Sequence, residues 1–153
     1  MRPQFKRLEY GFGLVESLVA LVVVSVGMIG IAVLYGQGLG ASRTALFRTH
    51  AVILASDMAD RIRLNRMAGI SYQSGGAGTD RNCEPGGATC TPAQMAEHDL
   101  WVWNAQIDQL LPGGDGVVAF TAASPPVYTI RVTWQEVTFG PITHEIAIRV
   151  PDL

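Results

Sequence analysis

A single carboxylate stands at the start of a long apolar stretch. Glu16 directly precedes residues 17–42, among which no residue is charged. On membrane-insertion scales an acidic group costs about 2.5–3.5 kcal/mol at the centre of a transmembrane helix, and less near the interface. Because a simple anchor gains nothing from such a group, we interpret Glu16 as a functional carboxylate that requires a cationic partner.

The two cysteines offer a second possible chemistry. Cys83 and Cys90 lie in a segment rich in turn-forming residues. If this part of the chain is exported, a disulfide is favoured over two free thiols, and closing so short a loop stabilises the fold by about 2–3 kcal/mol. We expect no metal site, because two cysteines cannot form a four-thiolate zinc site and no further His or Cys pair has ligand spacing nearby.

No group of residues indicates catalysis. His50, His98 and His144 are scattered along the chain, and no Ser or Cys stands in a nucleophile motif. Glu97, His98 and Asp99 are adjacent, and neighbouring residues on a helix point in different directions. We therefore expect no catalytic residue, no enzymatic activity, no cofactor and no small-molecule substrate.

The composition excludes two classes of protein. The chain has 153 residues, which favours one domain, and 48% of them are hydrophobic. Only 16% are charged and the net charge is -2. A nucleic-acid partner is not expected, because neutralising phosphates requires a basic surplus, and a disordered polyelectrolyte is excluded.

The apolar stretch is long enough to cross a membrane. As a helix, residues 17–42 span about 39 Å, more than the roughly 30 Å hydrocarbon core. A cleaved secretory signal usually has a shorter apolar region and an A-x-A-like site, so a simple signal anchor is the stronger alternative. Arg2, Lys6 and Arg7 precede the stretch, which predicts a cytoplasmic N-terminus and an exported C-terminal part.

The apolar spacing predicts one helix from about Phe12 to Ala68, ended by Gly69. Asp57 and Arg61 are spaced as an i,i+4 ion pair within it. In the second half of this helix, apolar residues recur every three or four positions. They are Phe47, Ala51, Leu54, Met58 and Ile62, with Leu46 and Ile53 beside them.

A second helix is predicted to start at the Thr-Pro-Ala-Gln segment 91–94 and to stop at the Pro-Gly-Gly segment 112–114. Thr can cap a helix, Pro suits its first turn and Gln can complete a capping box. Trp101 and Trp103 lie in this helix and could stack on sugars or peptides, but we favour a role in the core.

Three strand-like segments follow, at 116–122, 127–137 and 142–150. In the last two, apolar and polar residues alternate, which is typical of an antiparallel sheet with one buried face. The apolar row of the long helix can cover that face. The sequence therefore predicts an α+β fold, in which a long N-terminal helix packs on a small antiparallel sheet with one additional short helix.

The segment from Gly11 to Leu21, GFGLVESLVAL, resembles the type IV prepilin signal. The resemblance implies that a prepilin peptidase cuts between Gly11 and Phe12, that Phe12 becomes the methylated N-terminus, and that Glu16 is the fifth residue of the mature chain. The apolar stretch would then be retained. The sequence departs from the family pattern at Tyr10 and Gly13.

Further segments are similar to the minor pilins known as type IV pilus modification protein PilV. These segments are 18–21, 26–30, 55–66, 99–103 and 111–114. The resemblance implies a type IV pilin-like fold and a subunit of the inner-membrane complex that initiates the pilus. Its partners would be other minor pilins, the major pilin, the prepilin peptidase and the inner membrane.

The implied organisation has three parts. Residues 1–11 would be a cleaved leader, residues 12–41 the transmembrane and assembly half of the helix, and residues 42–153 a periplasmic domain. The chain would thus cross the inner membrane once, with incorporation into the filament or its tip as a further expectation. In this scheme the amine of one subunit and Glu16 of a neighbour neutralise each other in low dielectric.

Two other functions stay open at this point. A minor pseudopilin of type II secretion has a similar signal and helix. A membrane-anchored adhesin or binding module differs in class, because it needs only an anchor and should tolerate Glu16→Leu.

Overall fold

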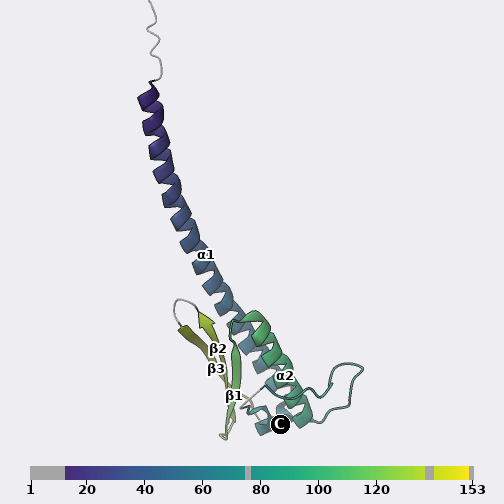
Figure 1. The fold of residues 1–153 in the computed structure, drawn as a ribbon. Coiled ribbons are helices and arrows are strands. Elements are labelled where there is room, and N and C mark those ends of the chain that lie inside the picture. Colours follow the sequence, from purple (N-terminus) through teal and green to yellow (C-terminus); the bar gives the residue numbers. More distant parts are fainter. Residues whose placement is uncertain (1–12, 75–76, 137–139, 152–153) are drawn as a thin grey trace, which may run out of the picture. The chain divides into compact units, whose positions relative to one another are not determined.

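The computed structural model describes residues 13–74, 77–136 and 140–151. Its elements follow the chain in the order helix α1, 3-10 helix η1, helix α2 and strands β1, β2 and β3 (Figure 1). Their bounds are Leu14–Leu64 for α1, Arg66–Tyr72 for η1, Pro92–Leu110 for α2, Asp115–Thr121 for β1, Val127–Glu136 for β2 and Gly140–Arg149 for β3. This arrangement confirms the fold class expected from the sequence.

Helix α1 is shorter at its C-terminal end than the sequence predicts. The α-helical pattern stops at Leu64, with Arg61 and Arg63 in the last turn, where basic side chains interact favourably with the helix dipole. The chain continues as η1, which bends at Gly69 because that residue adopts a φ of 51°. The prediction of α-helix as far as Ala68 is therefore wrong by one turn.

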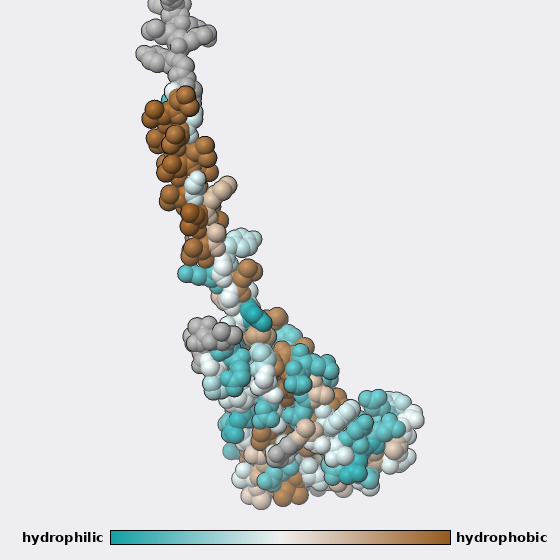
Figure 2. Space-filling model, in the orientation of Figure 1, coloured by the Kyte–Doolittle hydropathy of each residue, from teal (hydrophilic) through white to brown (hydrophobic). Residues whose placement is uncertain are grey.

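The chain divides into two compact units, Met1–Ser42 and Arg43–Leu153. In the first unit the described residues form only α1, which is long and apolar enough to cross a membrane by length and composition. Apolar side chains dominate the upper part of the visible face of this helix, and paler and hydrophilic residues appear toward its lower end (Figure 2).

In the second unit α1 contributes one row of buried residues to the core. The row consists of Ala51, Leu54, Ala55, Met58, Ala59 and Ile62, spaced three or four positions apart. Phe47 packs against the same core and is partly buried. The predicted row is thus confirmed, whereas Leu46 and Ile53 beside it are exposed.

Helix α2 begins with the predicted capping box. The Thr91 hydroxyl accepts a hydrogen bond from the backbone N–H of Gln94, and the Gln94 side chain accepts one from the N–H of Thr91. Trp103 and Ile107 lie on its buried face, and both approach Gly116 of β1 so closely that no side chain fits there. Gly116 therefore lets α2 pack directly on β1.

The sheet has the order β1-β2-β3, and both pairs of neighbours are antiparallel. Val118, Ile130 and Ile146 stand opposite one another across the three strands, so even-numbered residues share the inner face. On β2 this face is formed by Tyr128, Ile130, Val132 and Trp134, all at most 2% exposed. The alternation predicted for β2 and β3 is confirmed.

Candidate functional site

Glu16 lies in the first turn of α1, where the helix dipole favours a negative charge. The turn is set up by Gly13, whose carbonyl accepts hydrogen bonds from the N–H groups of Glu16 and Ser17 at 3.0 and 3.2 Å. The Glu16 side chain is exposed and makes no ion pair with any described residue. The predicted cleavage and methylation site, Gly11 and Phe12, lies outside the described residues.

The helix that follows Glu16 offers an apolar surface without further charge before Arg43. Its large apolar side chains, from Leu18 to Leu39, are all exposed within the chain, by 54% to 72%. Gly27 and Gly30 lie within continuous α-helix, and a side chain added at either would meet open space. The apolar side chains of this segment are therefore available to pack against lipid or against other helices.

A charged network joins α1, η1 and α2 in the second unit. Arg61 pairs with Asp57 on its own helix at 2.8 Å, as predicted, and with Asp99 of α2 at 3.0 Å. The Tyr72 hydroxyl donates to the other oxygen of Asp99 at 2.6 Å. Asn65 donates to the Tyr72 hydroxyl at 3.2 Å and to the carbonyl of Pro92 at 2.9 Å.

Burial and neighbouring charges both shift the pKa values of Tyr72 and Arg61 in this network. Burial raises the pKa of Tyr72, and the hydrogen bond to Asp99 and its charge raise it further. Burial alone would lower the pKa of Arg61, but hydrogen bonds and charge from Asp57 and Asp99 outweigh it and the pKa is raised. Arg61 is thus a permanent cation and Tyr72 a neutral donor, which suits a structural link.

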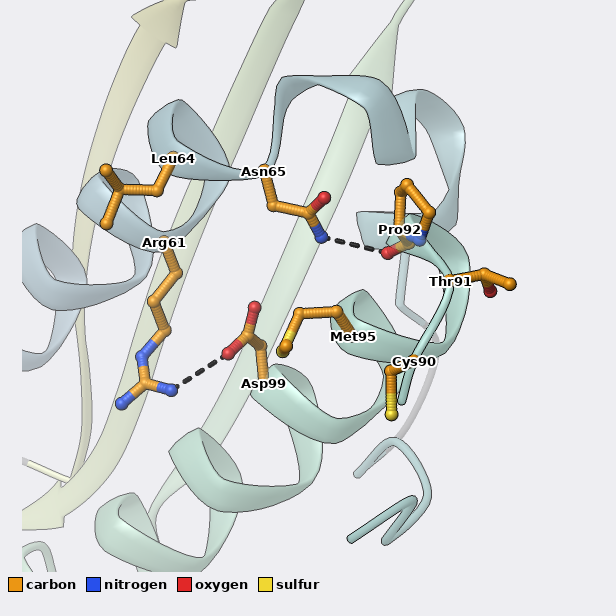
Figure 3. A pocket seen from close by; sticks show the side chains of 8 residues that line it. All are labelled: Arg61, Leu64, Asn65, Cys90, Thr91, Pro92, Met95 and Asp99. Carbon is orange, nitrogen blue, oxygen red and sulfur yellow. Dashed lines mark hydrogen bonds and ion pairs between the residues drawn. The ribbon is translucent and has the colours of Figure 1, made fainter. Parts of the chain in front are cut away.

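A pocket of about 410 Å³ lies beside this network (Figure 3). Its wall combines Arg61, Asn65 and Asp99 with the apolar side chains of Leu64, Pro92 and Met95, together with Cys90 and Thr91. The Asn65–Pro92 and Arg61–Asp99 contacts lie within the wall itself. The charged groups of the pocket therefore already have partners, and within the described residues no three His, Cys, Asp or Glu side chains gather as metal ligands.

The three adjacent residues Glu97, His98 and Asp99 do not act together. Glu97 pairs with Arg81 at 2.6 Å, and His98 contacts Asp80 at 3.3 Å, whereas Asp99 faces the Arg61 network. The expectation that these side chains point in different directions is confirmed.

The tryptophans of α2 have different environments. Trp103 is fully buried and donates its indole N–H to the carbonyl of Leu54 at 2.8 Å, which links α2 to α1. Trp101 is 40% exposed and stacks on His98, with 5.9 Å between ring centroids. The core role expected of this pair is therefore confirmed for Trp103 alone.

A disulfide joins Cys83 and Cys90, whose Cα atoms are 5.8 Å apart. The segment just before this loop contacts α2 through the Arg81–Glu97 and Asp80–His98 pairs. Because Cys90 immediately precedes the N-cap Thr91, the disulfide also anchors the start of α2.

Two polar contacts were missed by reasoning from the sequence. Asp99 stands four positions before Trp103, on the buried side of α2, and a charge there signals a buried partner. Glu136 is only 7% exposed and accepts hydrogen bonds from Thr44 and from the indole of Trp134. It continues the inward row of β2, so its burial could have been inferred from the alternation.

Two family models match the chain. The model described as type IV pilin Tt1218 matches residues 34–101, and the model described as prokaryotic N-terminal methylation motif matches residues 6–32. No curated protein and no solved structure matches the chain. Pilins are structural proteins, which suggests a role other than catalysis, and the motif implies processing by prepilin peptidase and association with membrane and pilus. The chain is thus similar to type IV pilins over residues 34–101 and to the N-terminal methylation motif over residues 6–32, and its long helix and antiparallel sheet are consistent with a type IV pilin fold.

Proposed function

We propose that the chain is a minor pilin that helps to initiate type IV pilus assembly and is incorporated into the filament. The observation that carries this proposal is Glu16, which has no ion-pair partner among the described residues and lies in the first turn of a helix that has no further charge before Arg43. The similarity of its central segments to PilV-type minor pilins supports the minor role.

The proposed mechanism is helix packing directed by one charge pair. Cleavage between Gly11 and Phe12 would place a free amine four residues before Glu16. In the apolar membrane interior an isolated carboxylate or amine is costly, and pairing the two between neighbouring subunits removes both costs. The pair would therefore select neighbours and set their axial register, while apolar packing supplies the contact area.

The proposed location follows from the same segment. Arg2, Lys6 and Arg7 precede the apolar stretch, so the N-terminus would be cytoplasmic and the chain would cross the inner membrane once. The second unit, from Arg43 onward, would be periplasmic, and its disulfide suits that oxidising compartment.

The test compares Glu16→Leu and Glu16→Gln with the control Glu84→Gln, which alters an exposed loop carboxylate. In a host lacking the native gene, both Glu16 variants should stay in the membrane but give few or no pili, whereas the control should restore them. Intact mass should give a chain that starts at Phe12 with one added methyl group.

Three results would overturn the proposal. Normal piliation with Glu16→Leu would favour a plain anchor, as an adhesin requires. Normal piliation without the gene, combined with lost protein secretion, would indicate a type II pseudopilin. An intact chain from Met1, in a host whose peptidase is active, would remove the assembly mechanism.

A further inference from the structure

The two edges of the sheet are treated differently by the rest of the chain. On β1, the N–H of Val118 donates to the Ser74 hydroxyl at 3.1 Å, and the Val118 carbonyl accepts from the Ser74 N–H at 2.9 Å. This segment covers the edge of β1. Within the described ranges no residue makes equivalent bonds to the outer edge of β3.

The direction of the β3 backbone groups follows from one hydrogen bond. The N–H of Val150 donates to the carbonyl of Pro126 at 3.1 Å, so Val150 faces β2. Backbone groups alternate along an antiparallel strand, so even-numbered residues of β3 bond to β2 and odd-numbered residues face outward. Thr143, Glu145, Ala147 and Arg149 therefore present free N–H and C=O groups along the open edge.

Beside this edge the inner face of β3 is incompletely covered. Ile142, His144 and Ile146 are only half-buried, although their neighbours on β2 are fully buried. A groove of about 380 Å³ runs between α1 and β3 here, lined by Arg48 and Val52 of α1, Trp134 of β2, and residues 142–144 of β3. Val52 is 47% exposed, so apolar surface is available on both sides.

None of the residues that line the groove is acidic. Neither Arg48 in the groove nor Arg149 on the edge strand forms an ion pair with any described residue. The Nε2 atom of His144 is buried, yet it has no hydrogen-bond partner among the described residues. A buried polar atom without a partner is costly, which points to a group that arrives from outside.

We propose that the open edge of β3 and this groove bind an extended segment of a partner protein by strand addition, and that a carboxylate of the segment enters the groove. The segment pairs with the outward backbone groups of β3. Its apolar side chains cover Ile142 and Ile146, and its carboxylate accepts hydrogen bonds from Arg48 and from Nε2 of His144. This surface is separate from Glu16, so the inference does not depend on the proposed assembly mechanism.

The test uses the full chain in detergent and a nine-residue peptide of alternating Thr and Val in which one central Val is replaced by Glu. Binding is measured by fluorescence anisotropy, and the bound edge is located by amide hydrogen exchange. The Glu peptide should bind about tenfold more tightly than its Gln counterpart, because a charged acceptor makes the stronger hydrogen bond. Exchange should slow in 140–149 and stay unchanged in β1.

Variants of the protein separate the two parts of the site. Ala147→Pro removes one outward N–H but no bond to β2, so it should abolish binding, whereas Ala147→Val keeps the N–H and should bind normally. Arg48→Ala should leave the Gln peptide unaffected and abolish the preference for Glu. Thermal unfolding of each variant checks that the fold is intact.

Four outcomes would overturn the inference. They are no binding at millimolar peptide, equal binding of the Glu and Gln peptides, equal binding by both Ala147 variants, and protection outside 140–149. If protection of β3 instead grows with protein concentration in the absence of peptide, the edge pairs with a second copy and the partner proposed here is wrong.

Discussion

Replacing Asp99 by Asn should lower the free energy of unfolding of the second unit by about 2 kcal/mol. Asp99 is 8% exposed and accepts two hydrogen bonds, from Arg61 at 3.0 Å and from Tyr72 at 2.6 Å. A hydrogen bond to a charged group contributes about 1.5–3 kcal/mol, against about 0.5–1.5 kcal/mol for a neutral one. Asn keeps the shape but has one acceptor oxygen and one NH2 group, so the oxygen still accepts from Arg61 while the bond accepted from Tyr72 is lost and the NH2 can only donate to the Tyr72 hydroxyl. Each bond of a charged acceptor is thus replaced by a neutral one, at a cost of about 1 kcal/mol.

The loss should stay below the roughly 3–5 kcal/mol seen when a buried charge loses its only partner. Arg61 keeps Asp57 at 2.8 Å and its side chain is 26% exposed, so it is never left unpaired. Urea unfolding followed by tryptophan fluorescence measures the effect. Asp60→Asn is the matched control, because Asp60 also pairs with an arginine but is 68% exposed.

The control should change the free energy of unfolding by at most about 0.5 kcal/mol, as exposed pairs contribute little. If Asp99→Asn and Asp60→Asn cost the same, the network does not hold α1, η1 and α2 together and the reasoning is wrong. Combining Asp99→Asn with Tyr72→Phe should cost less than the sum of the two, because both remove the same hydrogen bond.

Three further predictions concern the same unit. The raised pKa of Tyr72 means that its contribution to stability is constant below pH 10.0 and lost above it, by about 1.4 kcal/mol per pH unit. Tyr72→Phe should flatten the fall in stability between pH 10 and 11, measured by urea unfolding. Replacing both Cys83 and Cys90 by Ser should cost about 2–3 kcal/mol by loop entropy, measured by thermal unfolding. Gly116→Ala sets a Cβ within 2.5 Å of the buried Trp103 ring, and should cost about 1–3 kcal/mol of unfolding free energy.

Each of these has a result that would contradict it. An alkaline slope as steep in Tyr72→Phe as in the parent protein would remove the role given to that phenol. Equal stability of the oxidised and Cys-free proteins would mean that closing the 83–90 loop does not stabilise the fold. For Gly116→Ala, Gly36→Ala is the control, because the added Cβ there meets open space.

The sequence predicts the elements that depend on local chemistry. The capping box at Thr91 rests on residues three apart, and the alternation of β2 and β3 follows from the strand period, so both could be inferred correctly. The end of α1 could not, because Met67 and Ala68 are compatible with α-helix, whereas the chain already leaves α-helical geometry at Asn65, before the bend at Gly69.

The functional residues also differ in whether the sequence alone reveals them. Glu16 stands out because a charge in an apolar run is visible in any sequence. The partners of Asp99 do not, since Arg61 lies 38 positions away and Tyr72 lies 27 positions away. A contact of that kind is set by how helices pack, and no spacing rule along the chain specifies it.

The placement of core residues also sets when the second unit can fold. The buried row of α1 ends at Ile62, yet the strands that cover it are the last elements of the chain, and the core is complete only with Val150. At roughly 5–20 residues per second, synthesis of the intervening chain takes about 4–18 s. For that interval the apolar row has no partner from its own sheet. Until the strands are made, α2 is the element of this chain that can pack on the row, and a longer linker before β1 would lengthen that interval.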